Sequence, residues 1–160
     1  MPLTARDIMQ TSILSVEPST PLVDVQRMFF EEEIHGAPVV DETGAVLGIV
    51  TSTDLARSAV EESNDLVARP AAVDYLAEIL EFSPADWPDI SRRLDGYFGD
   101  RVAADVMFKD AVSVQASTPV REVAQVLSRN RIHRVLVFEG DQLCGIVSNS
   151  DLVAMIANGA

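Results

Sequence analysis

Apolar and polar residues follow one pattern that occurs twice along the chain. In each occurrence a short apolar run, at residues 13–16 or 111–114, precedes a stretch with apolar residues at helical spacing. In the first of these stretches Val25, Met28 and Phe29 lie at positions i, i+3 and i+4, which predicts a helix with one apolar face. Two further apolar runs, joined by a polar turn that contains glycine, predict a β-hairpin, and a second helix follows. The pattern therefore predicts two β-α-β-β-α copies.

The ends of these elements are indicated by cap and turn residues. Ser19 or Thr20 is expected to cap the first helix, with Pro21 in its first turn. The hairpin strands are predicted at residues 37–40 and 46–50 in the first copy and at 135–138 and 143–147 in the second. The second helix is expected to begin near Ser52, and its counterpart near Asn149. Each copy is therefore expected to be a small sheet with two helices.

Residue identities show that the two copies form an internal repeat. Residues 5–9 (Ala-Arg-Asp-Ile-Met) correspond to residues 103–107 (Ala-Ala-Asp-Val-Met), and residues 48–55 correspond to residues 145–152. One copy is too short to cover its own sheet, so we expect the two copies to pack together about a pseudo-twofold axis. The predicted fold class is α+β, with two such repeats.

Residues 60–102 have no counterpart in either copy and are predicted to form a helical insert. Apolar residues at helical spacing predict helices on both sides of Pro70, and the segment holds the single tryptophan of the sequence, Trp87. We therefore expect a first repeat at residues 1–59, the insert, and a second repeat at residues 103–160. Two roles remain open for the insert: a covering for the core, or a surface for dimerisation or partner docking.

Charge narrows the classes of partner. The chain has 25 acidic and 12 basic residues and a formal net charge of −13, whereas proteins that bind nucleic acid or anionic membranes present a basic face. The acidic excess lies in the first copy and the insert. The second copy is nearly neutral, and its arginines gather at Arg129, Arg131 and Arg134. We therefore expect no nucleic-acid partner, and we expect any phosphorylated ligand to be small.

The compartment is indicated by apolar runs and by cysteine content. No apolar run approaches the roughly 20 residues that a membrane span needs, and residues 1–4 lack the features of a secretory signal. The single cysteine, Cys144, cannot form an intramolecular disulfide. We therefore expect a cytoplasmic protein with no membrane partner.

The strongest local motif is an apolar strand that ends in Gly-Ile-Val-[Thr/Ser]-x-[Thr/Ser]-Asp, at residues 48–54 and 145–151. A strand that runs into a helix start leaves free backbone N–H groups and a dipole that favours an anion. The motif hydroxyls are candidates for a phosphate site: Thr51, Thr53, Ser148 and Ser150. The carboxylates of Asp54 and Asp151 would repel a phosphate but can accept two hydrogen bonds from ribose hydroxyls. A plain helix cap is the alternative for each motif.

Taken together, these features closely resemble the CBS-domain family, arranged as a tandem pair. The resemblance rests on residues 7–9, 19–21, 34–40 and 48–54 and on their second-copy partners. It implies clefts between the repeats that bind adenosine-containing ligands, namely AMP, ADP, ATP or S-adenosyl compounds. It also implies a homodimer of such pairs. In the family the motif aspartate binds ribose, which carries over to Asp54 and Asp151, and the motif hydroxyls lie near ribose and phosphate.

The resemblance implies further ligand contacts. The strand positions around adenine carry over to Ile13, Leu14, Ala37, Val112 and Val135. Residues 131–134 (Arg-Ile-His-Arg) look like the phosphate-contacting segment of the gamma subunit of AMP-activated kinase, which carries a phosphate contact over to His133 and Arg134. The first copy has His35 and Gly36 at these positions, which the resemblance also makes candidate ligand contacts, although this copy lacks the guanidinium. Solvated positions at a helix end and a strand edge are the alternative for the arginines of this segment.

Catalytic machinery is not expected, because the sequence shows no arrangement of nucleophile and base and no metal-ligand spacing. The first hypothesis is a regulatory module that binds an adenine nucleotide, needs no obligatory cofactor or metal, and signals to its own dimer or to a regulated protein partner. The second is a ligand-free module for dimerisation or protein interaction. The third is a divalent-cation sensor that uses the acidic run of residues 31–33.

Overall fold

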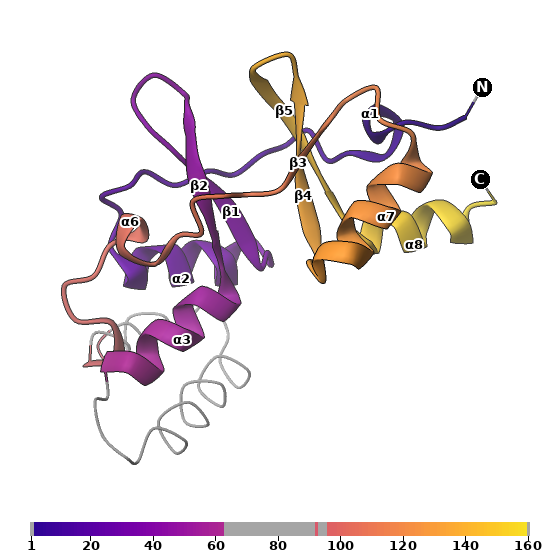
Figure 1. Ribbon diagram of the computed structural model, residues 1–160. Coiled ribbons are helices and arrows are strands. Elements are labelled where there is room, and N and C mark those ends of the chain that lie inside the picture. The colour runs from indigo at the N-terminus through magenta and orange to yellow at the C-terminus, as the bar shows by residue number, and fades with distance from the viewer. Residues whose placement is uncertain (1, 63–91, 93–95, 160) are drawn as a thin grey trace. The chain divides into compact units, whose positions relative to one another are not determined.

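The computed structural model describes residues 2–62, 92 and 96–159, and its helices and strands are labelled in Figure 1. The chain forms two compact units. The continuous unit is Ser15–Lys109, and the split unit combines Met1–Leu14 with Asp110–Ala160. Trp87 and the helices predicted around Pro70 lie outside the described residues. Each unit contains one small sheet with helices, so the α+β prediction is confirmed.

The continuous unit has a two-stranded sheet. Its elements are α2 (Leu22–Glu31), β1 (Gly36–Val40), β2 (Val46–Thr51), α3 (Ser52–Glu62) and α6 (Ala103–Val106). β1 and β2 form the predicted antiparallel hairpin, in which Gly36 faces Thr51. The strand predicted at residues 13–16 is wrong. The chain passes from the split unit to the continuous unit after Leu14, and Val16 makes a single parallel bridge to β1.

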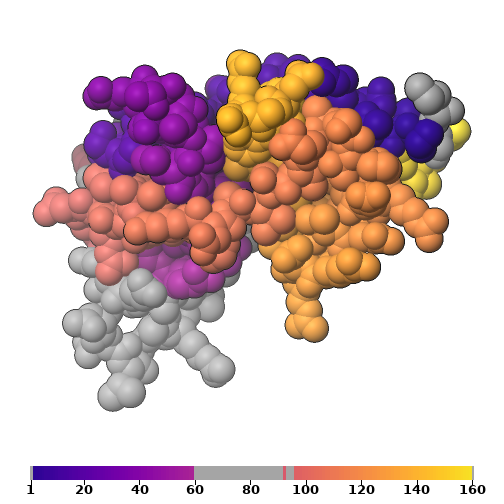
Figure 2. Space-filling model, turned by 45° about the horizontal axis from the view of Figure 1, so that its top comes forward, coloured from indigo at the N-terminus to yellow at the C-terminus, as the bar shows by residue number. Residues whose placement is uncertain are grey.

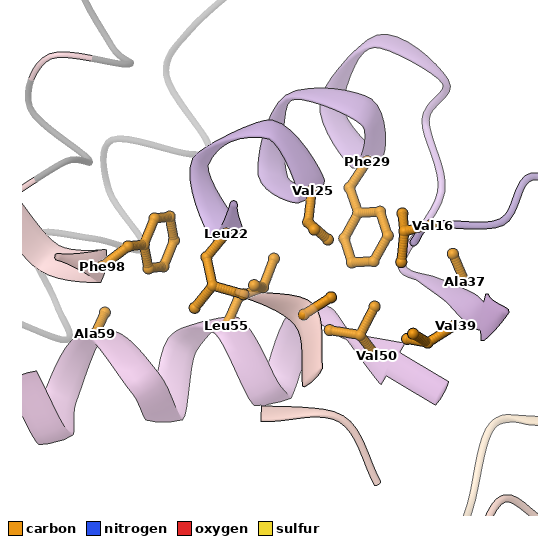
Figure 3. Close-up of a cluster of buried hydrophobic side chains, with 11 residues drawn as sticks. Val16, Leu22, Val25, Phe29, Ala37, Val39, Val50, Leu55, Ala59 and Phe98 are labelled. Carbon is orange, nitrogen blue, oxygen red and sulfur yellow. The ribbon is translucent and has the colours of Figure 1, made fainter. Parts of the chain in front are cut away.

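An apolar core holds the continuous unit together (Figure 3). The helices and the hairpin each contribute buried side chains: Leu22, Val25 and Phe29 from α2, Leu55 and Ala59 from α3, and Ala37, Val39 and Val50 from the hairpin. The apolar face predicted for α2 is therefore confirmed. Phe98, which is 1% exposed, adds an aromatic ring from the C-terminal end of the insert. Burial of these apolar side chains is the main stabilising contribution to the unit.

The split unit has a three-stranded sheet in the order β3-β4-β5. Its elements are α1 (Ala5–Ile8), β3 (Ser113–Gln115), α7 (Val120–Asn130), β4 (Arg134–Glu139), β5 (Gln142–Ser148) and α8 (Asn149–Ala157). β3 and β4 are parallel, and β4 and β5 form the predicted antiparallel hairpin. Val135 and Val137 face the core with Val123 of α7. Since side chains alternate along a strand, Arg134 lies on the opposite face of β4.

The first segment of each repeat packs in the unit built by the other repeat. In the split unit Ala5 N donates to the Thr118 carbonyl at 2.8 Å, and Figure 2 shows this indigo segment beside orange residues of the second repeat. In the continuous unit Ala103 N donates to the Thr20 carbonyl at 2.9 Å. Each compact unit therefore contains residues from both sequence repeats.

The C-terminal end of the insert also explains a wrong prediction about helix caps. Pro21 is the N-cap residue of α2, and neither Ser19 nor Thr20 caps the helix. The first backbone amide of α2, that of Leu22, donates to the Arg101 carbonyl at 3.1 Å. A backbone carbonyl from a segment distant in the sequence thus takes the place of the expected side-chain cap.

Candidate functional site

The repeated motif forms a junction between a strand and a helix in both units. β2 ends at Thr51 and α3 begins at Ser52, while β5 ends at Ser148 and α8 begins at Asn149. The helix starts predicted near Ser52 and Asn149 are therefore confirmed. At each junction a motif hydroxyl and a motif carboxylate meet within the first turn of the helix.

In the continuous unit the carboxylate of Asp54 is held at the start of α3. The backbone N–H and the hydroxyl of Thr51 both donate to Asp54 Oδ2, at 2.8 and 2.9 Å. The Asp54 side chain is 11% exposed, and its Oδ1 lies 3.6 Å from Arg57 Nη1, which exceeds a hydrogen-bonding distance. The motif thus forms the helix cap, and in the described part of the chain no hydrogen-bond donor reaches Oδ1.

In the split unit the carboxylate of Asp151 has the same cap and an additional partner. The backbone N–H and the hydroxyl of Ser148 donate to Asp151 Oδ2, at 2.7 and 2.8 Å. Gln10 Nε2 donates to Asp151 Oδ1 at 2.8 Å. Sequence analysis missed Gln10, because it lies outside the motif and reaches Asp151 through the exchanged N-terminal segment.

The second hydroxyl of each motif differs from the first. Thr53 and Ser150 are exposed in the first turns of α3 and α8, whereas Thr51 and Ser148 donate to the motif aspartates. The predicted contact of these four hydroxyls with a phosphate stays a prediction. The exposed pair is the more accessible to a ligand.

The structure separates the histidine and the arginine that stand side by side in the sequence. Arg134 is half-buried and pairs across the hairpin with Ser148, and burial lowers the pKa of its guanidinium. In the described part of the chain no acidic side chain forms an ion pair with it. His133 Nδ1 lies 3.1 Å from Asn149 Nδ2, and His133 lines a pocket of about 350 Å³ together with Arg131. Arg134 is not among the residues that line this pocket.

The first repeat has the same backbone at this place but not the cation. Gly36 begins β1 opposite Thr51, in the position that Arg134 takes in β4. His35 is exposed, and its carbonyl accepts a hydrogen bond from Ser52 N at 2.9 Å. The hairpin of the continuous unit therefore offers no guanidinium at this position.

The positions that the resemblance assigns to adenine differ in their exposure. The side chains of Ala37 and Val135 belong to the buried cores, so their backbone alone is left to face a ligand. Val112 packs against the core of the split unit. Ile13 is half-buried, and Leu14 is exposed. Among the five, Leu14 has the most accessible apolar side chain, and the adenine contact stays a prediction for all of them.

A cavity of about 590 Å³ opens beside Asp54 in the continuous unit. Charged side chains of both signs line it among the described residues: Asp54, Arg57, Ser58, Arg101, Asp105 and Val106. The buried Ser58 hydroxyl accepts a hydrogen bond from Arg101 Nη1 at 2.8 Å. Sequence analysis missed Arg57, Ser58 and Arg101, because the motif ends at Asp54 and Arg101 belongs to the insert, which has no repeat counterpart.

The described part of the chain has neither a cluster of metal ligands nor a membrane-spanning helix. No three metal-ligating side chains gather there, and residues 31–33 are exposed where α2 ends. Within the same residues, no helix has both the length and the apolar character of a membrane span.

Comparison with known proteins identifies relatives of the same architecture. The family model of the CBS domain matches residues 5–61 and 102–158. The protein MJ1426 of Methanocaldococcus jannaschii is 28% identical over 150 residues, which cover 92% of this chain and 88% of that protein. The chloroplast protein CBSX2 of Arabidopsis thaliana is 23% identical over 139 residues, and the chain spans 56% of that relative's length.

Two solved structures share the fold. The crystal structure of CBSX2 in complex with AMP has a TM-score of 0.70 at 21% identity and covers 98% of this chain and 97% of its own. The CBS domain pair of MJ0100, in complex with 5′-methylthioadenosine and S-adenosyl-L-methionine, has a TM-score of 0.69 at 17% identity and covers both chains fully. The family model matches most of the chain, and it matches in the two copies that the internal repeat predicts. The chain belongs to the CBS domain family.

Proposed function

We propose that the chain is a regulatory module that binds an adenosine-containing ligand. The observation that carries the proposal is Arg134, a half-buried cation opposite Ser148 without an acidic partner in the described part of the chain. Removing a guanidinium from water is costly unless an anion pairs with it. A ligand phosphate supplies that anion with bidentate geometry, and the nearby start of α8 favours negative charge.

The motif aspartates support a ribose as the second part of the ligand. Their carboxylates are held rigidly by the helix caps, and carboxylate oxygens accept hydrogen bonds from the hydroxyls of a sugar. The ligands in the structures of CBSX2 and MJ0100 all contain adenosine. AMP, ADP, ATP and S-adenosyl compounds are therefore the candidates for this chain.

Calorimetric titration with AMP, ADP, ATP and S-adenosylmethionine tests the proposal. We expect at least one of them to bind, and we expect Arg134→Ala to weaken AMP more than adenosine, which lacks the phosphate. Arg129→Ala is the matched control, because Arg129 is an exposed arginine in the last turn of α7. No binding of any of the four at millimolar concentration would overturn the proposal, and equal losses for AMP and adenosine would reject the role of Arg134.

A second candidate function, a module for dimerisation, is favoured by α8. Val153 and Ile156 are 66% and 68% exposed, and α8 has no buried residue. Contiguous exposed apolar patches mark interaction surfaces, and Val153 and Ile156, three residues apart, lie next to each other on one face of α8. We propose that a second copy of this chain covers them, so that the ligand signal passes to the dimer or to a separate regulated protein.

Sedimentation equilibrium tests the dimer. Ile156→Glu places a charge in the proposed interface, and we expect it to convert the dimer to a monomer. Leu47→Glu, at an exposed apolar position of β2, is the matched control and is expected to leave the mass unchanged. A dimer that survives Ile156→Glu would exclude α8 as its interface.

We propose no catalytic role, no metal and no obligatory cofactor for the module. The ligand acts by binding, and the consequence is a change in what the module contacts. The cytoplasm is the compartment where adenine nucleotides would reach it.

A further inference from the structure

The two motif carboxylates differ in what binds their second oxygen. Gln10 Nε2 donates to Asp151 Oδ1 at 2.8 Å. The backbone of Gln10 is fixed at that place by two hydrogen bonds with Ile146, of 2.8 and 3.0 Å. Since the backbone N–H and hydroxyl of Ser148 bind Oδ2, both oxygens of Asp151 have donors from the chain itself.

Phe108 holds the equivalent place in the continuous unit. Its backbone makes the same pair of hydrogen bonds, of 2.8 and 3.0 Å, with Ile49. Phe108 is 57% exposed and its side chain has no hydrogen-bond donor, so it cannot donate to Asp54 as Gln10 donates to Asp151. Arg57 Nη1 lies 3.6 Å from Asp54 Oδ1, and the Arg57 side chain is 64% exposed. Asp54 Oδ1 therefore keeps its capacity to accept hydrogen bonds, and Asp54 lines the cavity of about 590 Å³.

The two hydroxyls of a ribose need two acceptor positions. A carboxylate offers about four, two on each oxygen. In both aspartates the cap supplies two donors to Oδ2. Asp54 thus has two positions left on Oδ1, whereas Asp151 has one, beside the amide of Gln10.

We infer that Gln10 is a specificity-determining residue that occupies the Asp151 carboxylate and leaves Asp54 as the ribose-binding carboxylate of this chain. The inference rests on the proposed function and decides which repeat supplies the ribose contact. A ribose at Asp151 would have to displace a charge-assisted hydrogen bond from Gln10. That loss corresponds to an affinity roughly 10- to 100-fold weaker than at Asp54.

Calorimetric titration of the full chain with AMP tests the inference. We expect about one AMP per chain, with an affinity roughly 10- to 100-fold lower in Asp54→Ala and unchanged in Asp151→Ala. Gln10→Met keeps the size of the side chain and removes its amide donors, so we expect a second AMP to bind. Gln115→Met is the matched control: Gln115 is an exposed glutamine of the same unit that bonds to Gly140, and its loss is expected to leave the stoichiometry unchanged.

The side-chain amide signals of Gln10 in a ¹H–¹⁵N NMR spectrum provide a second readout that needs no variant. We expect these signals to stay in place when AMP is added. Their displacement by AMP, a loss of affinity confined to Asp151→Ala, or an unchanged stoichiometry in Gln10→Met would each overturn the inference while AMP binding stands. Absence of AMP binding in the wild type and in every variant would overturn AMP as the ligand of the proposed function as well.

Discussion

The continuous unit and the split unit share a hairpin followed by a helix, but they fill their cores differently. The buried core of the continuous unit includes Phe29, Leu55 and Phe98, whereas the buried cluster around Val123 in the split unit consists of valine and alanine with Leu127. Leu136 is buried outside that cluster. Phe98 comes from the insert and has no counterpart in the other repeat. Figure 3 shows its ring beside Leu22 and Ala59. Two copies of one sequence pattern can therefore form the same strands and helices and still differ in how their hydrophobic cores are filled. The reason is that a residue outside the pattern completes one of the cores.

Truncation of Phe98 should have the largest effect on this comparison. Phe98→Ala leaves a cavity in the buried core, and we expect it to lower the free energy of unfolding by about 3–5 kcal/mol. Val123→Ala, in the core of the split unit, is the counterpart and is expected to cost about 2 kcal/mol, since fewer methyl groups are removed. Urea unfolding followed by circular dichroism measures both. A loss in Phe98→Ala no larger than that in Val123→Ala would show that the end of the insert does not support the core.

Gly48 and Gly145 each pack against an exchanged segment. Alanine at these two positions should give a smaller difference in the free energy of unfolding. A Cβ at Gly48 would lie 2.6 Å from the carbonyl oxygen of Phe108, which is fixed by a hydrogen bond from Ile49 N at 3.0 Å. At Gly145 the nearest atoms belong to Met9, with Sδ at 2.5 Å, Cγ at 2.8 Å and Cβ at 2.9 Å. A change of rotamer moves the sulfur and Cγ away, so that only Met9 Cβ has to shift with the backbone. We therefore expect Gly48→Ala to cost about 2–3 kcal/mol and Gly145→Ala about 1 kcal/mol.

Gly96→Ala is the control for both glycine variants. Gly96 is helical and none of the described residues lies within 4 Å of its Cβ position, so we expect no loss, or a gain of about 0.5–1 kcal/mol. Scanning calorimetry of the three variants measures the order. Equal losses in Gly48→Ala and Gly145→Ala would mean that the backbone of residue 108 yields as easily as the methionine side chain.

The smallest expected effect concerns the pH dependence of stability, in which the two exchanged helices, α1 and α6, differ. Thr4 donates its backbone N–H and its hydroxyl to Asp7, at 2.7 and 2.8 Å, and these bonds lower the pKa of the Asp7 carboxyl. α6 has Val102 in the place of Thr4 and lacks the hydroxyl. A lowered pKa stabilises the folded state above the pKa of the unfolded chain, about 3.9, and this contribution is lost as the pH falls below that value.

Thr4→Val removes one of the two bonds to Asp7. We expect the pKa of Asp7 to rise toward its ordinary value and the loss of stability between about pH 5 and pH 3 to become smaller. Thr4→Ser keeps the hydroxyl and should leave both unchanged. NMR titration of the Asp7 carboxyl carbon measures the shift. If the pKa is the same in Thr4→Val and in the wild type, the backbone N–H alone holds the carboxylate.

The fold was predictable where the apolar face of a helix or strand packs against elements that are close to it in the sequence. The hairpins and the helices after them follow from periodicity and turn residues, and they are confirmed. The apolar pattern wrongly predicted a strand at residues 13–16, where the chain passes from one unit to the other. It also failed at the start of α2, where the Arg101 carbonyl accepts the bond that Ser19 or Thr20 was expected to accept. Both failures depend on contacts with distant segments.

The candidate site was predictable in part for the same reason. The motif by itself placed Asp54 and Asp151 at helix starts, because a cap involves residues three apart. Gln10 was not predicted, since its contact with Asp151 spans most of the chain. The separation of His133 from Arg134 was missed because adjacent residues at the start of a strand point to opposite faces.

The amino-acid sequence by itself determined the internal repeat, the strand-helix junctions and the family, because each depends on residue types at short, regular spacing. The tertiary structure alone decided which segment completes each unit. It also decided that Asp54 Oδ1 accepts no hydrogen bond from the described residues, and that Arg134 is half-buried with no acidic partner among them. The physical reason is that these properties depend on a hydrogen bond, a glycine contact or a buried ring between segments far apart in the sequence. Such contacts leave no periodic signal in either segment.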